Sequence, residues 1–177
     1  IKTDKFNSKI ENQFKEINEN LKIDLKKINI VLDPFNFNFK LKTIGTNLSY
    51  NKKIIQLENV RSIVSIKSLV NNNFSLTELN ISTKPLKINN LISFIRIFKN
   101  DVKFYVAEKL IKDGYLVADL NLEFDKNGKI KDNFTINGFV KKVKIDLFKK
   151  YRISDIEFDF DFYKNNLKFL DVKMKTN

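Results

Sequence analysis

The fold is decided by residues 153–163, which read ISDIEFDFDFY. From Asp155 to Phe162 apolar side chains and carboxylates alternate one by one. Successive side chains of a β-strand point to opposite faces of a sheet, so a period of two predicts a strand with one apolar and one charged face. The apolar face of this predicted strand carries Ile156, Phe158, Phe160 and Phe162.

The same period recurs along most of the chain. Residues 35–42 read FNFNFKLK, and their odd positions are Phe35, Phe37, Phe39 and Leu41. Between residues 115 and 125 the even positions include Leu116, Leu120, Leu122 and Phe124. With the further alternating stretches, such as 60–69, 74–82 and 129–147, we expect about ten strands, mostly sequential and antiparallel.

Two segments have the period of a helix instead. In residues 4–21 the apolar side chains are spaced three or four apart, which puts them on one helix face: Phe6, Ile10, Phe14, Ile17 and Leu21. A second helical segment is expected over 89–113, before Gly114, which is a helix stop signal.

The sequence predicts a single domain over residues 1–177, because no linker rich in Gly, Pro or Ser divides it. Its expected parts are a helix (4–21), a first set of strands (22–88), the helical segment (89–113) and a second set of strands (114–177). Since the chain begins with Ile1 rather than Met, we expect it to be a fragment of a longer chain.

The composition excludes several kinds of site. The chain of 177 residues has no His and no Cys, which removes Ser-His-Asp and Cys-His catalysis, imidazole or thiolate zinc sites and disulfides. The net charge is +12, from 33 basic and 21 acidic residues. Such a charge raises nucleic acid or anionic membrane as partners. Only Arg61, Arg96 and Arg152 are arginines, however, and arginine is the better reader of phosphate.

An apolar sheet face must be covered. A second sheet or closure into a barrel would cover it with protein, and an open groove would leave it to lipid. The alternation by itself favours the sandwich or the barrel. A closed β-domain acting as a basic nucleic-acid-binding or protein-binding module is therefore the alternative to a lipid-binding function.

Several short patterns follow one another in a set order. The helix Phe6–Leu21 leads into a strand that ends Leu32-Asp33-Pro34, and Lys84-Pro85-Leu86-Lys87-Ile88 leads into the second helical segment. Between and after them come Leu57-Glu58-Asn59-Val60, Ile63–Leu69, Leu79-Asn80-Ile81, Gly114–Leu120, Leu122-Glu123-Phe124-Asp125, Asn127-Gly128 and Ile136-Asn137-Gly138. In this order the chain resembles the N-terminal segment of the AsmA-like family, within the repeating β-groove, bridge-like lipid transfer superfamily.

The resemblance implies a mostly β (α+β) fold. Its long curved antiparallel sheet would form an open hydrophobic groove, with an N-terminal helix and one or two helices in the middle. It implies a bacterial, periplasmic cell-envelope protein, anchored to the inner membrane through a helix upstream of Ile1, that takes part in outer membrane biogenesis. Phospholipid would move between the inner and outer membranes along the groove.

The apolar stripes are then the candidate groove floor, where phospholipid acyl chains would bind. These stripes are Phe35, Phe37, Phe39, Leu41, Leu116, Leu120, Leu122, Phe124, Ile156, Phe158, Phe160 and Phe162. A groove of this kind needs no catalytic residue, metal or cofactor, so we expect no enzyme, and no specific nucleic-acid partner. Protein partners are not indicated.

The carboxylates of residues 153–163 allow a second interpretation. Asp155, Glu157, Asp159 and Asp161 share one strand face, where an acid–base pair as in glycosidases could form. A solvated strand face is the interpretation that the sequence favours.

Overall fold

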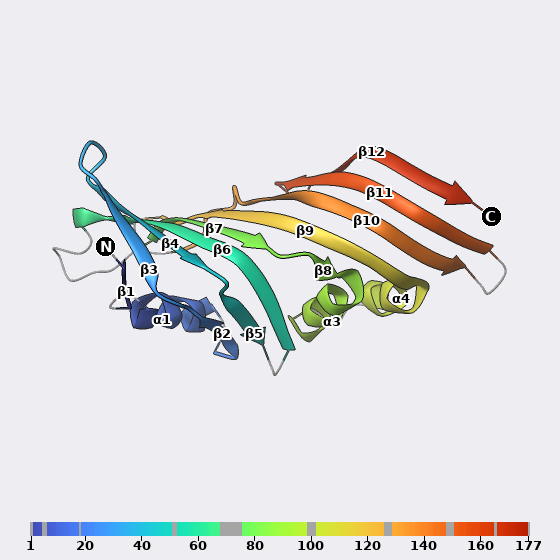
Figure 1. Ribbon diagram of the computed structural model, residues 1–177, viewed down its shortest axis with the longest axis horizontal. Coiled ribbons are helices and arrows are strands. Elements are labelled where there is room, and N and C mark those ends of the chain that lie inside the picture. The colour runs from blue at the N-terminus through green and yellow to red at the C-terminus, as the bar shows by residue number, and fades with distance from the viewer. Residues whose placement is uncertain are drawn as a thin grey trace. The chain divides into compact units, whose positions relative to one another are not determined.

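The computed structural model describes residues 2–4, 7–17, 19–50, 53–67, 76–98, 102–125, 129–147, 151–164 and 166–176 (Figure 1). The chain forms two compact units. Unit 1 comprises Ile1–Thr83 and Asp119–Thr135, and unit 2 comprises Lys84–Ala118 and Ile136–Asn177.

Unit 1 is an antiparallel sheet with a helix near the N-terminus. The helix is α1 (Asn7–Ile17), and the strands are β1 (Lys2–Thr3), β2 (Leu21–Asp24), β3 (Ile28–Asp33), β4 (Asn38–Ile44), β5 (Asn47–Tyr50), β6 (Lys53–Ser65) and β7 (Leu76–Thr83). The order of pairing is β1-β3-β4-β6-β7, and β5 joins β2 to β6. Residues 119–123 of β9 pair with β7 as the last strand of this unit.

Helix α1 packs against β2 (Figure 1). Ile10 and Phe14, four residues apart, are both buried, as the helical period predicts. The side-chain amide of Asn7 donates a hydrogen bond of 3.1 Å to the carbonyl oxygen of Leu25, which fixes the start of the helix over the end of β2.

Unit 2 has two helices on one face of its strands. The helices are α3 (Ile88–Phe98) and α4 (Val102–Leu110), and the strands are β8 (Leu86–Lys87), β9 (Ile111–Glu123), β10 (Thr135–Leu147), β11 (Tyr151–Tyr163) and β12 (Asn166–Thr176). Strands β9 to β12 are hydrogen-bonded in chain order, and β8 pairs with the first half of β9.

The strand order shows that the sheet is open. It runs β1-β3-β4-β6-β7-β9-β10-β11-β12, and within the described residues β1 and β12 end it without pairing to each other. The fold is therefore mostly β, an antiparallel sheet with a helix near the N-terminus and helices in the middle. This confirms the predicted fold class, and the sheet of the described residues is open rather than closed.

Three strands of unit 2 contain a residue with positive φ. These residues are Lys142 in β10, Asp155 in β11 and Asp171 in β12, with φ of 54°, 51° and 50°. At each of them the apolar pattern changes from odd to even positions or back, as at the buried pair Val140 and Val143. One extra residue in a strand reverses which side chains face the core, so a bulge restores the apolar residues to the same face.

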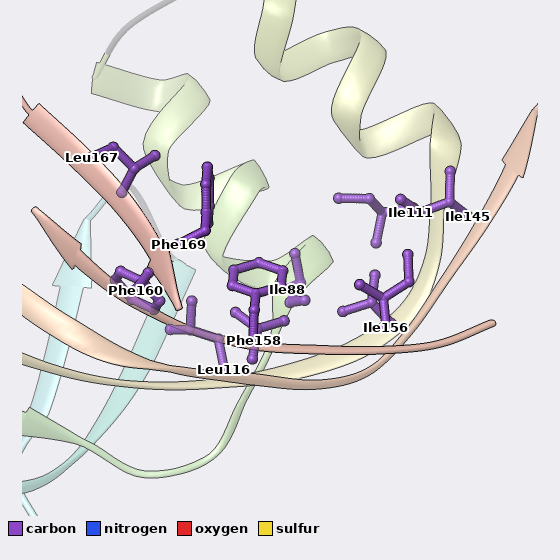
Figure 2. Close-up of a pocket in the computed structure, with 11 residues that line it drawn as sticks. Ile88, Ile111, Leu116, Ile145, Ile156, Phe158, Phe160, Leu167 and Phe169 are labelled. Carbon is purple, nitrogen blue, oxygen red and sulfur yellow. The ribbon is translucent and has the colours of Figure 1, made fainter. Parts of the chain in front are cut away.

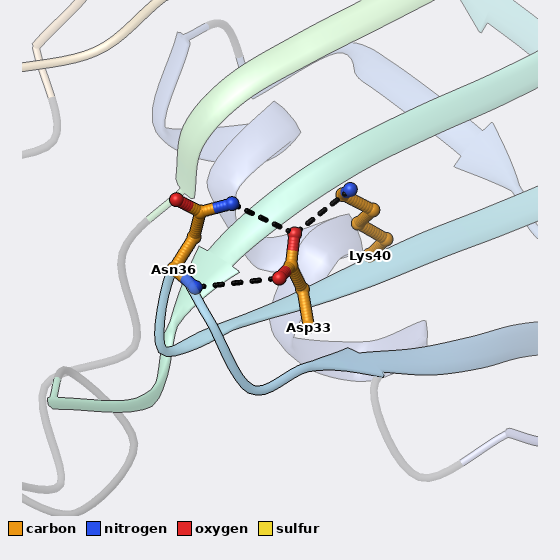
Figure 3. A network of polar contacts seen from close by, with 3 residues as sticks. All are labelled: Asp33, Asn36 and Lys40. Carbon is orange, nitrogen blue, oxygen red and sulfur yellow. Dashed lines mark hydrogen bonds and ion pairs between the residues drawn. The ribbon is translucent and has the colours of Figure 1, made fainter.

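The predicted strand over 35–42 is wrong in its first half, because residues 34–37 form the turn between β3 and β4. Asp33 accepts hydrogen bonds from the backbone nitrogen of Asn36 (3.3 Å) and from its side-chain nitrogen (3.1 Å), and its Oδ2 lies 2.8 Å from Lys40 Nζ (Figure 3). Phe35 and Phe37 are 92% and 67% exposed at this turn. A side chain that accepts a hydrogen bond from a backbone nitrogen three residues later stabilises a turn in spite of an alternating pattern.

The element boundaries also differ from those expected. Helix α1 begins at Asn7, and β2 already begins at Leu21. The middle segment consists of helices α3 and α4, which begin at Ile88 and end at Leu110. Strand β9 begins at Ile111, three residues before Gly114. Parts of the predicted elements lie outside the described residues: 5, 6 and 18 of the first helix, 68–69 and 74–75 of two strands, and Asn127-Gly128.

The stabilisation of the turn at Asp33 depends on pH in a measurable way. The ammonium of Lys40 and the amide of Asn36 lower the pKa of Asp33 from 3.8 to about 2. Because the folded-state pKa lies below the unfolded value, the stabilisation of this turn is present above pH 3.8 and is lost as the pH falls through about 2. NMR titration of Lys40→Gln should give a higher pKa for Asp33. The control Lys42→Gln, two residues further along β4, should leave the pKa of Asp33 unchanged. An Asp33 that titrates at its usual value in the unaltered chain would contradict this account.

Candidate functional site

Unit 2 contains an apolar pocket of about 370 Å³ (Figure 2). Its lining residues come from the start of α3 and from four strands: Ile88, Ile111, Leu116, Val140, Val143, Ile145, Ile156, Phe158, Phe160, Leu167 and Phe169. We call this the unit 2 pocket. Every lining side chain is aliphatic or aromatic, so the pocket offers neither a hydrogen-bonding group nor a titratable one from its side chains.

Helices α3 and α4 cover the buried cluster that lies beside the pocket. Ile92 of α3 is buried in the same cluster as Val140, Val143 and Ile156, and Phe104 and Ala107 of α4 pack against that cluster. The two helices are tied together by Glu108 of α4, which accepts a 2.5 Å hydrogen bond from Ser93 Oγ and forms an ion pair with Arg96. Both helices therefore stay over the same part of the sheet.

The junctions of helix and strand place two further lining residues. The side-chain nitrogen of Asn89 donates a 3.1 Å hydrogen bond to the carbonyl oxygen of Ile111, and this joins the start of α3 to the start of β9. Ile88 and Ile111 thereby line the same pocket from segments 23 positions apart in the chain. Gly114 lies beside them, where a Cβ would be 2.8 Å from Ile88 Cδ1 and 3.1 Å from Val143 Cα.

Gly138 allows β9, β10 and β11 to approach closely below Phe160. A Cβ at this position would lie 2.1 Å from the carbonyl oxygen of Val117 and 3.1 Å from Cε1 of Phe160. Real Cβ atoms do not come so close to backbone atoms, so only glycine fits without a shift of the strands. The ring of Phe160 thus occupies space that a side chain at 138 would take.

Strand β12 forms the wall of the pocket that faces water. Phe160 pairs directly with Phe169, and Phe162 with Leu167, across the two strands. The rings of Phe158 and Phe169 meet edge to face, with centroids 5.2 Å apart. Leu167 and Phe169 are nevertheless 51% and 55% exposed. The pocket therefore has an apolar wall that the described residues do not seal.

Four of the twelve predicted floor residues line the unit 2 pocket: Leu116, Ile156, Phe158 and Phe160. Phe162 lies further along β11 and is half-buried. Five others belong to unit 1, where Leu41 and Phe124 are buried, Leu120 and Leu122 pair with Ile81 and Leu79, and Phe39 pairs with Leu32 and Val64. Phe35 and Phe37 lie in the exposed turn after β3, which is a correction to their predicted place on a strand.

The sequence interpretation missed seven lining residues: Ile88, Ile111, Val140, Val143, Ile145, Leu167 and Phe169. Leu167 and Phe169 alternate with lysine and could have been found by the period of two. Val143 and Ile145 follow the reversal at Lys142, which marks them as sharing a face with Val140. Ile88 and Ile111 carry no such signal, because only the tertiary structure brings the helix start to the strand.

Three of the four carboxylates of β11 lie opposite lysines of β12, and the fourth, Asp159, pairs in register with Leu170. Asp155 Oδ2 lies 3.2 Å from Lys175 Nζ, and Glu157 and Asp161 pair in register with Lys173 and Lys168 of β12. Lysines opposite carboxylates are the pairs that stabilise neighbouring strands. The arrangement supports the interpretation of these carboxylates as an outward strand face.

No described helix is long and apolar enough to cross a membrane, and no three metal-ligating side chains come together in the described part of the chain. Comparisons with protein-family models, with curated proteins and with solved structures found no match.

The close approach at Gly138 predicts a large effect of a single methyl group. Gly138→Ala should lower the free energy of unfolding of unit 2 by about 3 kcal/mol or more, because the methyl group meets backbone atoms that cannot give way. Gly45→Ala is the control: its methyl group would meet only Lys26 Nζ, at an ordinary contact distance of 3.7 Å, so it costs only its positive φ, about 1 kcal/mol. Urea denaturation measures both, and an equal loss in the two variants would refute the steric account.

Proposed function

We propose that this chain binds phospholipid acyl chains in the unit 2 pocket. The observation that carries the proposal is the lining of the pocket, which consists of Ile, Leu, Val and Phe side chains throughout. An apolar cavity of this kind does not hold water well and is filled favourably by an apolar ligand.

The size of the pocket suits part of one acyl chain. A volume of about 370 Å³ corresponds to roughly a dozen groups of the size of a water molecule, and a methylene is of similar size. Removing about a dozen methylenes from water gains on the order of 10 kcal/mol, which is enough to offset the cost of fixing a flexible chain.

The lack of polar groups in the lining decides the class of ligand. Small molecules with polar patterns need donors and acceptors at matching places, and a buried polar group without a partner is costly. An acyl chain has no such groups and differs from other acyl chains only in length and shape. The pocket would therefore accept hydrocarbon chains of several kinds.

The exposed wall at β12 gives the rest of a lipid a place in water. Leu167 and Phe169 contact the pocket on one side and solvent on the other. The opposite face of β12 carries Lys168 and Lys173, paired with the carboxylates of β11. A bound phospholipid would keep its acyl chain against the apolar wall and its headgroup in solvent.

The biological role proposed with this binding is that of an AsmA-like envelope protein. The chain would be a segment, anchored to the inner membrane by a preceding helix, that conducts phospholipid through the periplasm towards the outer membrane. The resemblance and the open antiparallel sheet with its N-terminal and middle helices support this role. It requires no catalytic residue.

Mass spectrometry of the purified protein tests the proposal. We expect phospholipid to co-purify and to be displaced by added fatty acid. Protein that contains no lipid, and that binds nucleic acid with a steep dependence on salt, would instead support the basic binding module.

Two neighbouring substitutions on β12 separate lipid binding from folding. Phe169→Asn removes a half-exposed ring from the pocket wall, and we expect acyl-chain binding to weaken by about tenfold or more, since an aromatic side chain contributes about 2 kcal/mol on burial. Leu170→Asn is the matched control, because Leu170 is similarly exposed and lies outside the lining. Binding of a fluorescent fatty acid measures both, and equal affinities would contradict the assignment of the pocket.

A further inference from the structure

Helix α4 has two apolar faces. Phe104 and Ala107 face the core of unit 2 and pack against its buried cluster. Val102 lies on the opposite face, together with Tyr105 and Val106, which follow it by three and four residues. Val102, Tyr105 and Val106 are 75%, 48% and 45% exposed. We call these three residues, with Lys103 and Lys109, the α4 patch. The described residues leave its apolar part uncovered.

The described residues of α4 bring positive charge to the α4 patch. The one carboxylate of α4, Glu108, is turned inward, where Ser93 and Arg96 of α3 contact it. Lys103 and Lys109 are exposed, and Lys109 Nζ and the Arg96 guanidinium lie 5.6 and 5.1 Å from the centre of the Tyr105 ring. The acidic group of the helix is thus neutralised within the protein, and lysines surround the exposed apolar side chains.

This combination fits the surface of an anionic bilayer. Exposed aliphatic side chains enter the boundary between headgroups and acyl chains, tyrosine lies at the headgroups, and lysine is attracted to anionic lipid. A nucleic acid would make use of the lysines but not of Val102 and Val106. A second copy of the chain would bring positive charge against positive charge.

We propose that the α4 patch is a membrane-docking surface for anionic phospholipid. Helix α4 ends at Leu110, and the next residue, Ile111, lines the unit 2 pocket. Docking through α4 would place the pocket within reach of the bilayer from which acyl chains are taken. The use of the docked state for lipid uptake rests on the function proposed above, whereas docking itself does not.

The natural absence of Trp provides a direct test. In Tyr105→Trp the new side chain is the only indole of the protein, and its emission should shift to shorter wavelength on mixing with vesicles of phosphatidylcholine and phosphatidylglycerol. Tyr163→Trp is the matched control, because Tyr163 is 44% exposed and also has a lysine, Lys164, over its ring. We expect little or no shift there.

Co-sedimentation with the same vesicles separates the contribution of the lysines from that of the exposed apolar side chains. Lys103→Gln with Lys109→Gln should lower the partition coefficient by about fivefold for each lysine on anionic vesicles, with little effect on phosphatidylcholine alone. Val102→Ser with Val106→Ser should weaken binding to both kinds of vesicle. The controls are Lys26→Gln with Lys27→Gln and Val31→Ser with Ile54→Ser, all exposed positions of unit 1.

Three results would overturn the proposal. These are no emission shift in Tyr105→Trp, an equal shift in Tyr163→Trp, and a shift that appears without vesicles as the protein concentration rises, which would identify a second copy as the occupant. Phe169→Asn should lose acyl-chain binding and keep the emission shift when combined with Tyr105→Trp. Failure of the pocket and failure of the docking surface are therefore distinguished.

Discussion

Water is excluded from the apolar face of β9, β10 and β11 by two short helices, and the rest of unit 2 depends on that cover. Ile88, Ile92, Val140, Val143 and Ile156 are buried under it. At about 2 kcal/mol for each such side chain, their burial contributes on the order of 10 kcal/mol, which is comparable to the whole stability of a small domain. The cover is incomplete, and the unit 2 pocket is the part of the apolar face that it leaves.

The apolar face itself is kept continuous by irregularities. A strand of thirteen residues such as β10 or β11 would, with a strict period of two, need apolar residues at one parity from end to end. The bulges at Lys142, Asp155 and Asp171 relieve this requirement, because after each bulge the side chains of alternate residues point to the opposite face of the sheet. Gly138 adds a second kind of irregularity, a position without a Cβ under the ring of Phe160. The pocket is therefore shaped by backbone geometry as much as by apolar side chains.

The sequence predicts the strands better than it predicts the site. The prediction from alternation is correct at Phe158 and Phe160, because alternation reflects the burial of one sheet face along the whole strand. At Phe35 and Phe37 the same pattern fails, since Asp33 and Asn36 stabilise a turn through local hydrogen bonds. Ile88 and Ile111 are brought together only by tertiary contacts. The division into two units has no linker to mark it, because the boundary passes through β9 and close to the start of β10.

A wall made only of hydrocarbon has a consequence for how the site can evolve. Exchange of Val140 or Val143 for isoleucine, or of Ile145 or Ile156 for valine, alters the cavity by one methylene and leaves no donor or acceptor stranded. Each step costs little stability compared with the loss of a hydrogen-bonded group. Substitutions of this kind would therefore change the size of the cavity in small steps, through neutral drift, while the sheet beneath keeps its register.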